Sequence, residues 1–390
     1  MLSVNFQKCT GCGACVQACP KKCISWDEKD FGFNYPLIDV DVCVDCGRCE
    51  NVCPIDSDLK KPDGQRAYAV VLKDKDTLLK STSGGMFSAL AGYVFENKGV
   101  VYGCSMESGF QVKHIRVSVE KDLEKLRGSK YVQSNTENTF AQAEADLKNG
   151  LVVLYTGTPC QIAGLYSYLG KEYDNLITAD IVCHGVGSQK YFDKFMDYLK
   201  EANKDMTDLK FRSKEYVGWS CGGGVVVFRS QTDNIKKIPF YNYKNFYYHY
   251  FLNSEIYRES CYSCSYANIA RQGDFTLGDF WGVEKLGLDL DTSKGCSLLL
   301  VNTQKGAEIF NTIDLVGKCE VSIDNAVKHN GQLSCPSDRK ASRAERMNEY
   351  NAVTGVEIQK RYLKANKKVR LKGFAKRVMP YSLRRKLRSL

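Results

Sequence analysis

Short apolar runs alternate with stretches of helical periodicity over most of the chain, beginning near residue 67. These runs predict strands at 67–72, 100–103, 112–119, 151–155 and 177–182. The strand at 112–119 alternates between apolar and polar residues, so we expect it to be half-exposed. Helical spacing predicts helices over about 86–97 and over a stretch that ends near 169. Strands that alternate with helices are typical of an α/β or α+β domain.

The start of the chain has a different pattern, in which one cysteine spacing occurs twice. Both runs have two, two and three residues between successive cysteines and end in Cys-Pro: Cys9, Cys12, Cys15 and Cys19, then Cys43, Cys46, Cys49 and Cys53. This is the bacterial spacing for [4Fe–4S] clusters, in which the fourth cysteine of each run ligates the other cluster. We therefore predict two clusters, one on Cys9, Cys12, Cys15 and Cys53, the other on Cys43, Cys46, Cys49 and Cys19.

Zinc is the alternative metal for four thiolates, but it favours separated pairs over two complete runs. Cys23 fits neither run, and we interpret it as a buried or spare thiol. A polar stretch with Pro62 and Gly64 predicts a linker over 56–65.

Composition and charge limit the location and the partners. Eighteen cysteines with cluster spacing indicate a reducing compartment, since secreted thiols form disulfides. The chain begins with no basic-then-apolar leader and has no apolar run near 18 residues, so we expect a cytoplasmic protein that does not span a membrane.

The net charge of +10 is concentrated at the end of the chain. Residues 360–390 carry 13 of the 55 basic residues and no acidic residue, so the body is close to neutral. A near-neutral body argues against a nucleic-acid-binding core. The basic tail also carries apolar residues, which is typical of a segment that lies on an anionic membrane surface, although a solvated end fits equally well.

Two polar segments could bind a phosphate. Ser83, Gly84 and Gly85 precede the predicted 86–97 helix, where backbone N–H groups favour an anion, but an ordinary N-cap explains them too. Lys130 lies in the polar segment 128–134 and could meet a phosphate or a flavin, or simply be solvated.

Four dispersed cysteines suggest a third cluster. Cys160 and Cys183 follow predicted strand ends, where open α/β sheets place ligands. Cys261 and Cys264 form a two-cysteine clip that needs two more ligands to complete a cube. We predict a third [4Fe–4S] cluster on these four, by elimination. The cysteines that remain as substitutes are Cys104, Cys221, Cys296, Cys319 and Cys335.

Taken together, six ordered motifs resemble the coenzyme F420 hydrogenase/dehydrogenase beta-subunit family, including its bacterial members encoded near surface-polysaccharide genes. The motifs are 83–85, 129–134, 157–161, 183–185, 261–264 and 278–282. The resemblance implies FAD and a cluster beside it, with Cys160, Cys183, Cys261 and Cys264 as ligands. It also implies flavin-site candidates, namely Ser83, Gly84, Gly85, Lys130, Tyr131, Gln133, Ser134 and Thr158.

We therefore expect a dicluster ferredoxin domain (1–62) fused to a mixed α/β domain that comprises an FAD-binding part (66–150) and a third-cluster part (151–335). A helical basic tail (336–390) follows. The expected function is an oxidoreductase that exchanges hydride with an organic molecule, deazaflavin-like or glycan-related, and single electrons with a redox partner such as ferredoxin or a reductase. His184 and Lys130 are the catalytic candidates, although His184 could be only structural. The alternatives are an electron-transfer subunit with no substrate of its own and a purely structural cluster scaffold.

Overall fold

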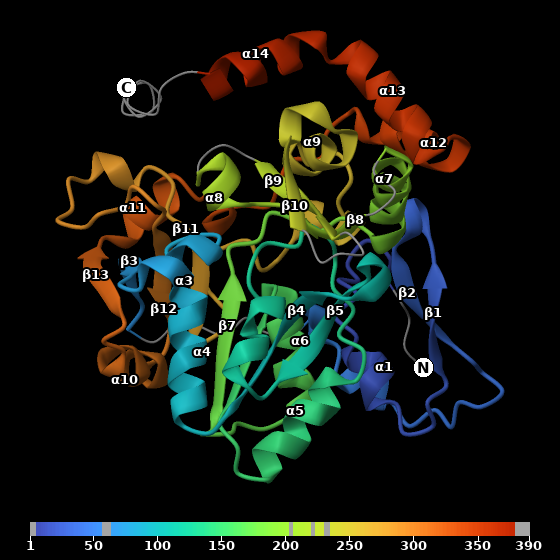
Figure 1. Ribbon diagram of the computed structural model, residues 1–390. Helices are drawn as coiled ribbons and strands as arrows, with labels where there is room; N and C mark the ends of the chain where they lie inside the picture. Colours follow the sequence, from blue (N-terminus) through green and yellow to red (C-terminus); the bar gives the residue numbers. More distant parts are fainter. Residues whose placement is uncertain (1–4, 57–63, 203–205, 220–222, 230–234, 379–390) are drawn as a thin grey trace.

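Figure 1 shows the computed structural model, which describes residues 5–56, 64–202, 206–219, 223–229 and 235–378. An eight-stranded sheet forms the centre of the molecule. Its strand order is β13 (Val316–Val321), β3 (Arg66–Leu72), β12 (Ser297–Val301), β11 (Phe275–Asp279), β7 (Leu176–Ile181), β6 (Val153–Gly157), β4 (Val100–Met106), β5 (Val112–Val117). The segments 66–150 and 151–335 therefore both contribute strands to one sheet.

The four central strands β11, β7, β6 and β4 are parallel, and the outer strands pair antiparallel. Central parallel strands are covered on both faces, which is why β4 and β6 are largely apolar in sequence. Leu154 and Ile177 belong to the core on one face, whereas Val153 and Leu176 belong to the core on the other.

Helices cover both faces. The helix α4 (Met86–Glu96) packs on β3, β4 and β6, while α5 (Thr139–Lys148) and α6 (Pro159–Leu169) pack on the opposite face. Local residues determine both ends of α6, because Thr158 and Gln161 form a capping box and Gly170 ends it with φ 64°. Shorter helices on the β3 side are α3 (Lys75–Lys80), α10 (Gln304–Thr312) and α11 (Ile323–Lys328).

The front module consists of α1 (Ala14–Ala18), the hairpin of β1 (Ile24–Glu28) and β2 (Asn34–Ile38), and α2 (Arg48–Asn51). It lies against the body of the protein, at the side of α6 (Figure 1). Cys12, Ala14 and Val52 are buried in the same core as Ile162 and Leu165 of α6. The cysteine loops are therefore packed onto the sheet domain.

An aromatic core connects the remaining elements. It gathers α7 (Gln189–Ala202), α9 (Phe246–Leu252), α13 (Gly355–Ala365) and a small sheet of β8 (Met206–Lys210), β9 (Gly223–Arg229) and β10 (Ile235–Tyr241). Phe31, Phe33 and Tyr35 of the front module belong to it. The last elements are α8 (Lys214–Val217), α12 (Arg343–Ala352) and α14 (Lys367–Val378).

The predicted strands and helices are confirmed, with ends that differ by a few residues. The predicted linker falls mostly on residues 57–63, outside the described residues. The tail is helical as far as Val378, and Tyr362 in α13 is buried, whereas α14 exposes Leu371 and Phe374. Of the helices in the described ranges, none combines the length and the apolar character that a membrane crossing requires.

Candidate functional site

A cavity of about 610 Å³ opens where the parallel strands β6, β7 and β11 end. This is the edge at which open α/β sheets bind ligands. Its volume lies within the ordinary range for cofactor and ligand pockets. The cavity contains every candidate of the sheet domain except Gly84: Ser83, Gly85, Lys130, Tyr131, Gln133, Ser134, Thr158, Cys160, Cys183, His184, Cys261 and Cys264.

The four dispersed cysteines come together at this cavity. Cys160 begins α6 and Cys183 follows β7, while Cys261 and Cys264 lie in the turn after α9. Burial and then the charge of Cys264 raise the pKa of Cys160 to about 11. Burial and then the charges of Cys261 and Cys160 raise the pKa of Cys183. These thiols therefore lie close enough to repel one another when ionised, and bound iron would take the place of their protons.

The residue types of this group suit an iron–sulfur cluster, because all four are cysteines. Among the described residues, no three His, Cys, Asp or Glu side chains converge as ligands of one metal ion. In a [4Fe–4S] cube each thiolate binds a different corner, so its four sulfurs lie farther apart than four ligands of one ion. The donor set thus fits a cube, although the ligand assignment stays a prediction.

In the front module, Cys9, Cys12, Cys15 and Cys53 are neighbours. Burial and then the charges of Cys9 and Cys53 raise the pKa of Cys15 to about 12. Burial raises the pKa of Cys12, and Cys15 and Cys160 add to that increase. The proximity of Cys12 to Cys160 places this first group next to the four cysteines at the cavity.

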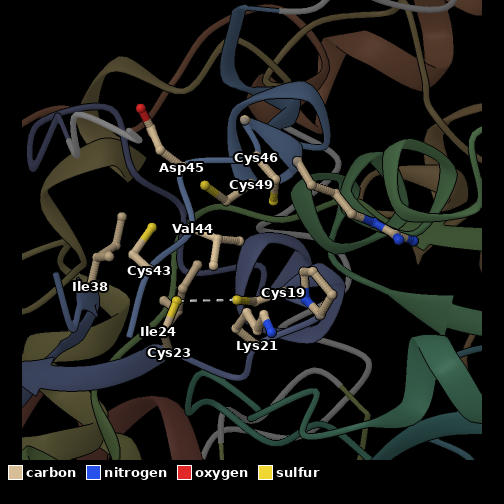
Figure 2. Close-up of a pocket in the computed structure, with 13 residues that line it drawn as sticks. Cys19, Lys21, Cys23, Ile24, Ile38, Cys43, Val44, Asp45, Cys46 and Cys49 are labelled. Atoms are coloured by element: carbon tan, nitrogen blue, oxygen red, sulfur yellow. Dashed lines mark hydrogen bonds between the residues drawn. The ribbon is translucent and has the colours of Figure 1, made fainter. Parts of the chain in front are cut away.

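The second group faces outward. Figure 2 shows Cys19, Cys43, Cys46 and Cys49 around one small space, and Cys46 is exposed. Cys23 is buried beside them, with its Sγ 3.4 Å from Cys19 Sγ. Burial alone would raise the pKa of Cys19, but hydrogen bonds from the backbone N–H and the thiol of Cys23 lower it. Cys23 therefore lies within hydrogen-bonding distance of a predicted cluster ligand, while the choice of Cys19 as that ligand stays a prediction from the spacing.

The loop 81–85 has a different role for each residue. Ser83 Oγ donates to Cys296 O at 2.7 Å, so its hydroxyl serves the loop itself. A Cβ on Gly84 would lie 2.0 Å from Val70 O, which explains the glycine by packing. Gly85 adopts φ 89° and caps α4. Thr82 lines the cavity, and its buried Oγ1 has no hydrogen-bond partner among the described residues.

The segment 129–134 forms another wall of the cavity. Lys130 Nζ donates to the carbonyls of Lys125 and Arg127, and burial lowers its pKa to about 8. Gln133 Nε2 donates to Thr10 O in the first cysteine loop at 2.8 Å. The same segment therefore contacts both the cavity and the front module.

A buried hydrogen-bond network lies behind Cys160. Thr158 Oγ1 lies 3.1 Å from Cys160 Sγ and donates to Gln161 Oε1. Gln161 Nε2 in turn donates to Ser134, whose Oγ lies 2.9 Å from His114 Nδ1. Burial lowers the pKa of His114 to about 4, so this histidine is neutral near pH 7.

His184 follows Cys183 directly and lines the cavity. Its Nδ1 lies 2.6 Å from the hydroxyl of Tyr257, and burial lowers its pKa to about 4. A neutral imidazole with one nitrogen held by a tyrosine can orient a neighbouring group or accept a proton from it.

Several residues at the site were missed or treated as structural from sequence. Arg212 pairs with Asp279, which also accepts a hydrogen bond from Trp219 Nε1, and Trp219 stacks on Trp281 at 5.3 Å. Lys214 donates to Leu78 O at 2.8 Å and to Ser83 O, and so anchors the 81–85 loop. Asp279 and Trp281 lie in the 278–282 motif, so this motif could have identified them as residues of the site. Lys214 carries no such signal.

Comparisons with known proteins match both parts of the chain. Residues 151–325 match the family model for the C terminus of the coenzyme F420 hydrogenase/dehydrogenase beta subunit, and residues 8–57 match the 4Fe-4S dicluster domain. Coenzyme F420-dependent sulfite reductase of Methanocaldococcus jannaschii is 24% identical over 332 residues, which are 80% of this chain and 47% of that protein. The chain thus spans about half the length of this curated relative.

A solved structure is also similar. It is a chain of the F420-reducing [NiFe] hydrogenase complex from Methanosarcina barkeri, in a xenon derivative, at 16% identity and a TM-score of 0.45. The match covers 79% of this chain and 93% of that chain.

Proposed function

We propose that the chain is an iron–sulfur flavoprotein oxidoreductase, because residues 151–325 match the family model for the C terminus of the coenzyme F420 hydrogenase/dehydrogenase beta subunit and residues 8–57 match the 4Fe-4S dicluster domain. FAD, when bound, exchanges a hydride with an organic molecule and single electrons with clusters. A hydride carries two electrons and one proton. Each hydride exchanged with the organic molecule therefore corresponds to two one-electron transfers through the clusters.

The arrangement of the cysteines supports a route for the single electrons. The group with exposed Cys46 would exchange them with a partner protein, and the group that contains Cys12 would pass them to the cysteines at the cavity. Tyr266 lies between these last two groups, since burial and the charges of Cys160 and Cys12 raise its pKa and its hydroxyl donates to Pro54 O.

One observation carries the flavin part of the proposal: the flavin-site candidates other than Gly84 line the same cavity as the four dispersed cysteines. The buried hydroxyl of Thr82 has no hydrogen-bond partner in the part of the chain that the structure describes, so it supplies a polar group that a ligand would satisfy. In this proposal the helix start at Gly85 and the segment 129–134 hold FAD, Cys160, Cys183, Cys261 and Cys264 hold a cluster beside it, and Lys130 and His184 orient or exchange protons with the bound molecules.

The test is anaerobic purification with counts of iron and sulfide per chain and extraction of flavin. Three cubes and a flavin predict about twelve iron atoms and one FAD. The variant C261S should then lose about four iron atoms. About eight iron atoms without flavin would remove both the third cluster and the hydride chemistry from the proposal.

An electron relay is the second candidate, favoured by the exposed Cys46 in the second cysteine group. The two candidates differ in one measurement. Flavin bleaching of the isolated chain by an organic hydride donor such as reduced deazaflavin supports the enzyme, whereas reduction only through a partner protein such as ferredoxin or a reductase supports the relay.

The cysteine content supports a cytoplasmic location, and α14 supports contact with the inner face of a membrane. This helix exposes Leu371 and Phe374 beside several lysines and arginines. Sedimentation with anionic lipid vesicles should therefore capture the full chain, and L371E/F374E should reduce the captured fraction severalfold. Equal capture by neutral vesicles would contradict an electrostatic contribution of the lysines and arginines to membrane binding.

A further inference from the structure

Arg258 is buried, and no acidic residue in the described part of the chain forms an ion pair with it. It is 1% exposed, although arginine is among the side chains that are almost never fully buried unless they are paired. Within the described ranges the other buried arginines each pair with a carboxylate: Arg271 with Asp180, Arg343 with Glu259 and Arg346 with Glu349. A buried charge without a partner is strongly unfavourable, so a negative group must compensate for it.

The contacts of Arg258 point to that negative group. Its Nε donates to Cys9 O at 2.7 Å, and its Nη2 donates to Asn34 O at 2.9 Å and lies 3.7 Å from Cys9 Sγ. Its Nη1 donates to Gln133 Oε1 at 3.1 Å. Cys9 is a predicted ligand of the buried cluster of the front module, so the guanidinium lies beside one of the predicted thiolates of that cluster.

Arg258 also joins this cluster to the cavity. Its backbone N–H donates to Val186 O, and its carbonyl accepts from the N–H of Cys261. Its guanidinium carbon lies 4.1 Å from the ring centre of Tyr35, which closes one side of the site. Hydrogen bonds with Val186 and Cys261, which line the cavity, therefore hold the backbone of Arg258, while its side chain contacts Cys9.

A cluster held by four thiolates is negatively charged, and it gains one more negative charge on reduction. Net charge and hydrogen bonds to the sulfurs set the reduction potential of such clusters. We propose that Arg258 is a positioning residue that stabilises the reduced form of the cluster on Cys9, Cys12, Cys15 and Cys53, and so raises its potential. The basic residues beside the other front cluster are Lys21 and Arg48, and both are exposed, so water screens their charges.

The inference rests on the iron–sulfur part of the proposed function, and an iron count separates the two. The test is a redox titration of the full-length protein followed by electron paramagnetic resonance, with R258Q, R258K and the control R48Q. In R258Q, which keeps a hydrogen-bond donor but loses the charge, we expect one of the one-electron steps to move to lower potential. The expected size is a tenfold change in the ratio of reduced to oxidised cluster, about 59 mV for one electron.

The step of the outward cluster on Cys19, Cys43, Cys46 and Cys49 should not move, and the step of the cavity cluster should move less than the first, because the charge of Arg258 also acts on Cys160 and Cys261. R258K should shift the first step by less than R258Q does, because lysine keeps the charge but not the forked donor. R48Q should leave every step in place. Unmoved steps in a fully iron-loaded R258Q, or equal movement of all steps, would overturn the inference. If R258Q fails to hold its iron, R258K decides, and an unmoved step there overturns it. A wild-type protein without iron would instead refute the proposed function.

Discussion

The front module and the sheet domain bring cysteines together in opposite ways. In the front module the ligands lie on two continuous loops, supported by α1 of five residues, α2 of four and a two-stranded hairpin. In the sheet domain, Cys160, Cys183 and the 261–264 clip come from distant segments that the parallel strands place at one edge. Short elements with little core depend on their metal for folding, whereas a buried sheet forms its site without it.

The largest expected effect compares one ligand from each region. Both C43S and C261S should lose about four iron atoms. Only C43S should also lose protection from hydrogen exchange, over 34–56, because there the cluster supports the backbone. Iron analysis and hydrogen-exchange mass spectrometry measure both outcomes, and C23S is the matched control that keeps its iron. Equal loss of protection around β6 and β7 in C261S would show that the sheet domain depends on its cluster for folding as much as the front module does.

The next effect concerns the buried ion pair between Asp180, near the carboxyl end of β7, and Arg271. Asp180 accepts hydrogen bonds from Arg271 and from the backbone N–H groups of Gln272 and Gly273, and both side chains of the ion pair are buried. D180A leaves the Arg271 charge uncompensated, so the free energy of unfolding should fall by about 3–5 kcal/mol. Denaturant unfolding measures it, while iron in the front module should be unchanged under native conditions.

The matched control for D180A is an exposed ion pair, Glu144 with Lys148 in α5. E144A should cost less than about 1 kcal/mol. A D180A effect no larger than that of the control would show that the sheet edge does not depend on the buried pair.

This difference between the regions also decides what could be predicted from sequence. The eight front cysteines were recognised because a continuous spacing encodes their geometry. The group of Cys160, Cys183, Cys261 and Cys264 could be inferred only by elimination and from the family resemblance, since no continuous spacing encodes it and the fold brings these residues together. Arg258 and Lys214 gave no signal, because a basic residue in a sequence does not reveal which carbonyl or thiolate lies opposite it in the fold.

A further contrast lies inside one loop of the sheet domain. A Cβ at Gly84 would lie 2.0 Å from Val70 O and 2.3 Å from Ser297 N. G84A should therefore lower the stability of the sheet domain by about 1–3 kcal/mol through backbone displacement. Thermal unfolding of the flavin-free protein measures this effect. An unchanged unfolding midpoint would show that Gly84 is not required for packing, and would favour the cofactor role suggested from sequence.

Thr82, two residues earlier, should behave differently. T82V removes the unpartnered hydroxyl at nearly constant shape, so stability without flavin should change little. FAD should bind up to about tenfold more weakly if the hydroxyl makes one hydrogen bond to it, which is worth about 0.5–1.5 kcal/mol. Flavin fluorescence titration measures the affinity. Unchanged affinity in T82V would remove Thr82 from the flavin site.

The smallest effect is a pH dependence that reports on the sheet domain alone. Burial lowers the pKa of Lys214 to about 7, although the charge of Asp279 acts in the opposite direction. Between pH 7 and 10.5 the unfolded chain then holds a proton that the folded chain has lost, so stability rises with pH in this window. One proton contributes at most about 1.4 kcal/mol per pH unit. K214M should remove this slope in denaturant unfolding between pH 7 and 9. Equal slopes in the two proteins would mean that Lys214 stays protonated where it holds the 81–85 loop.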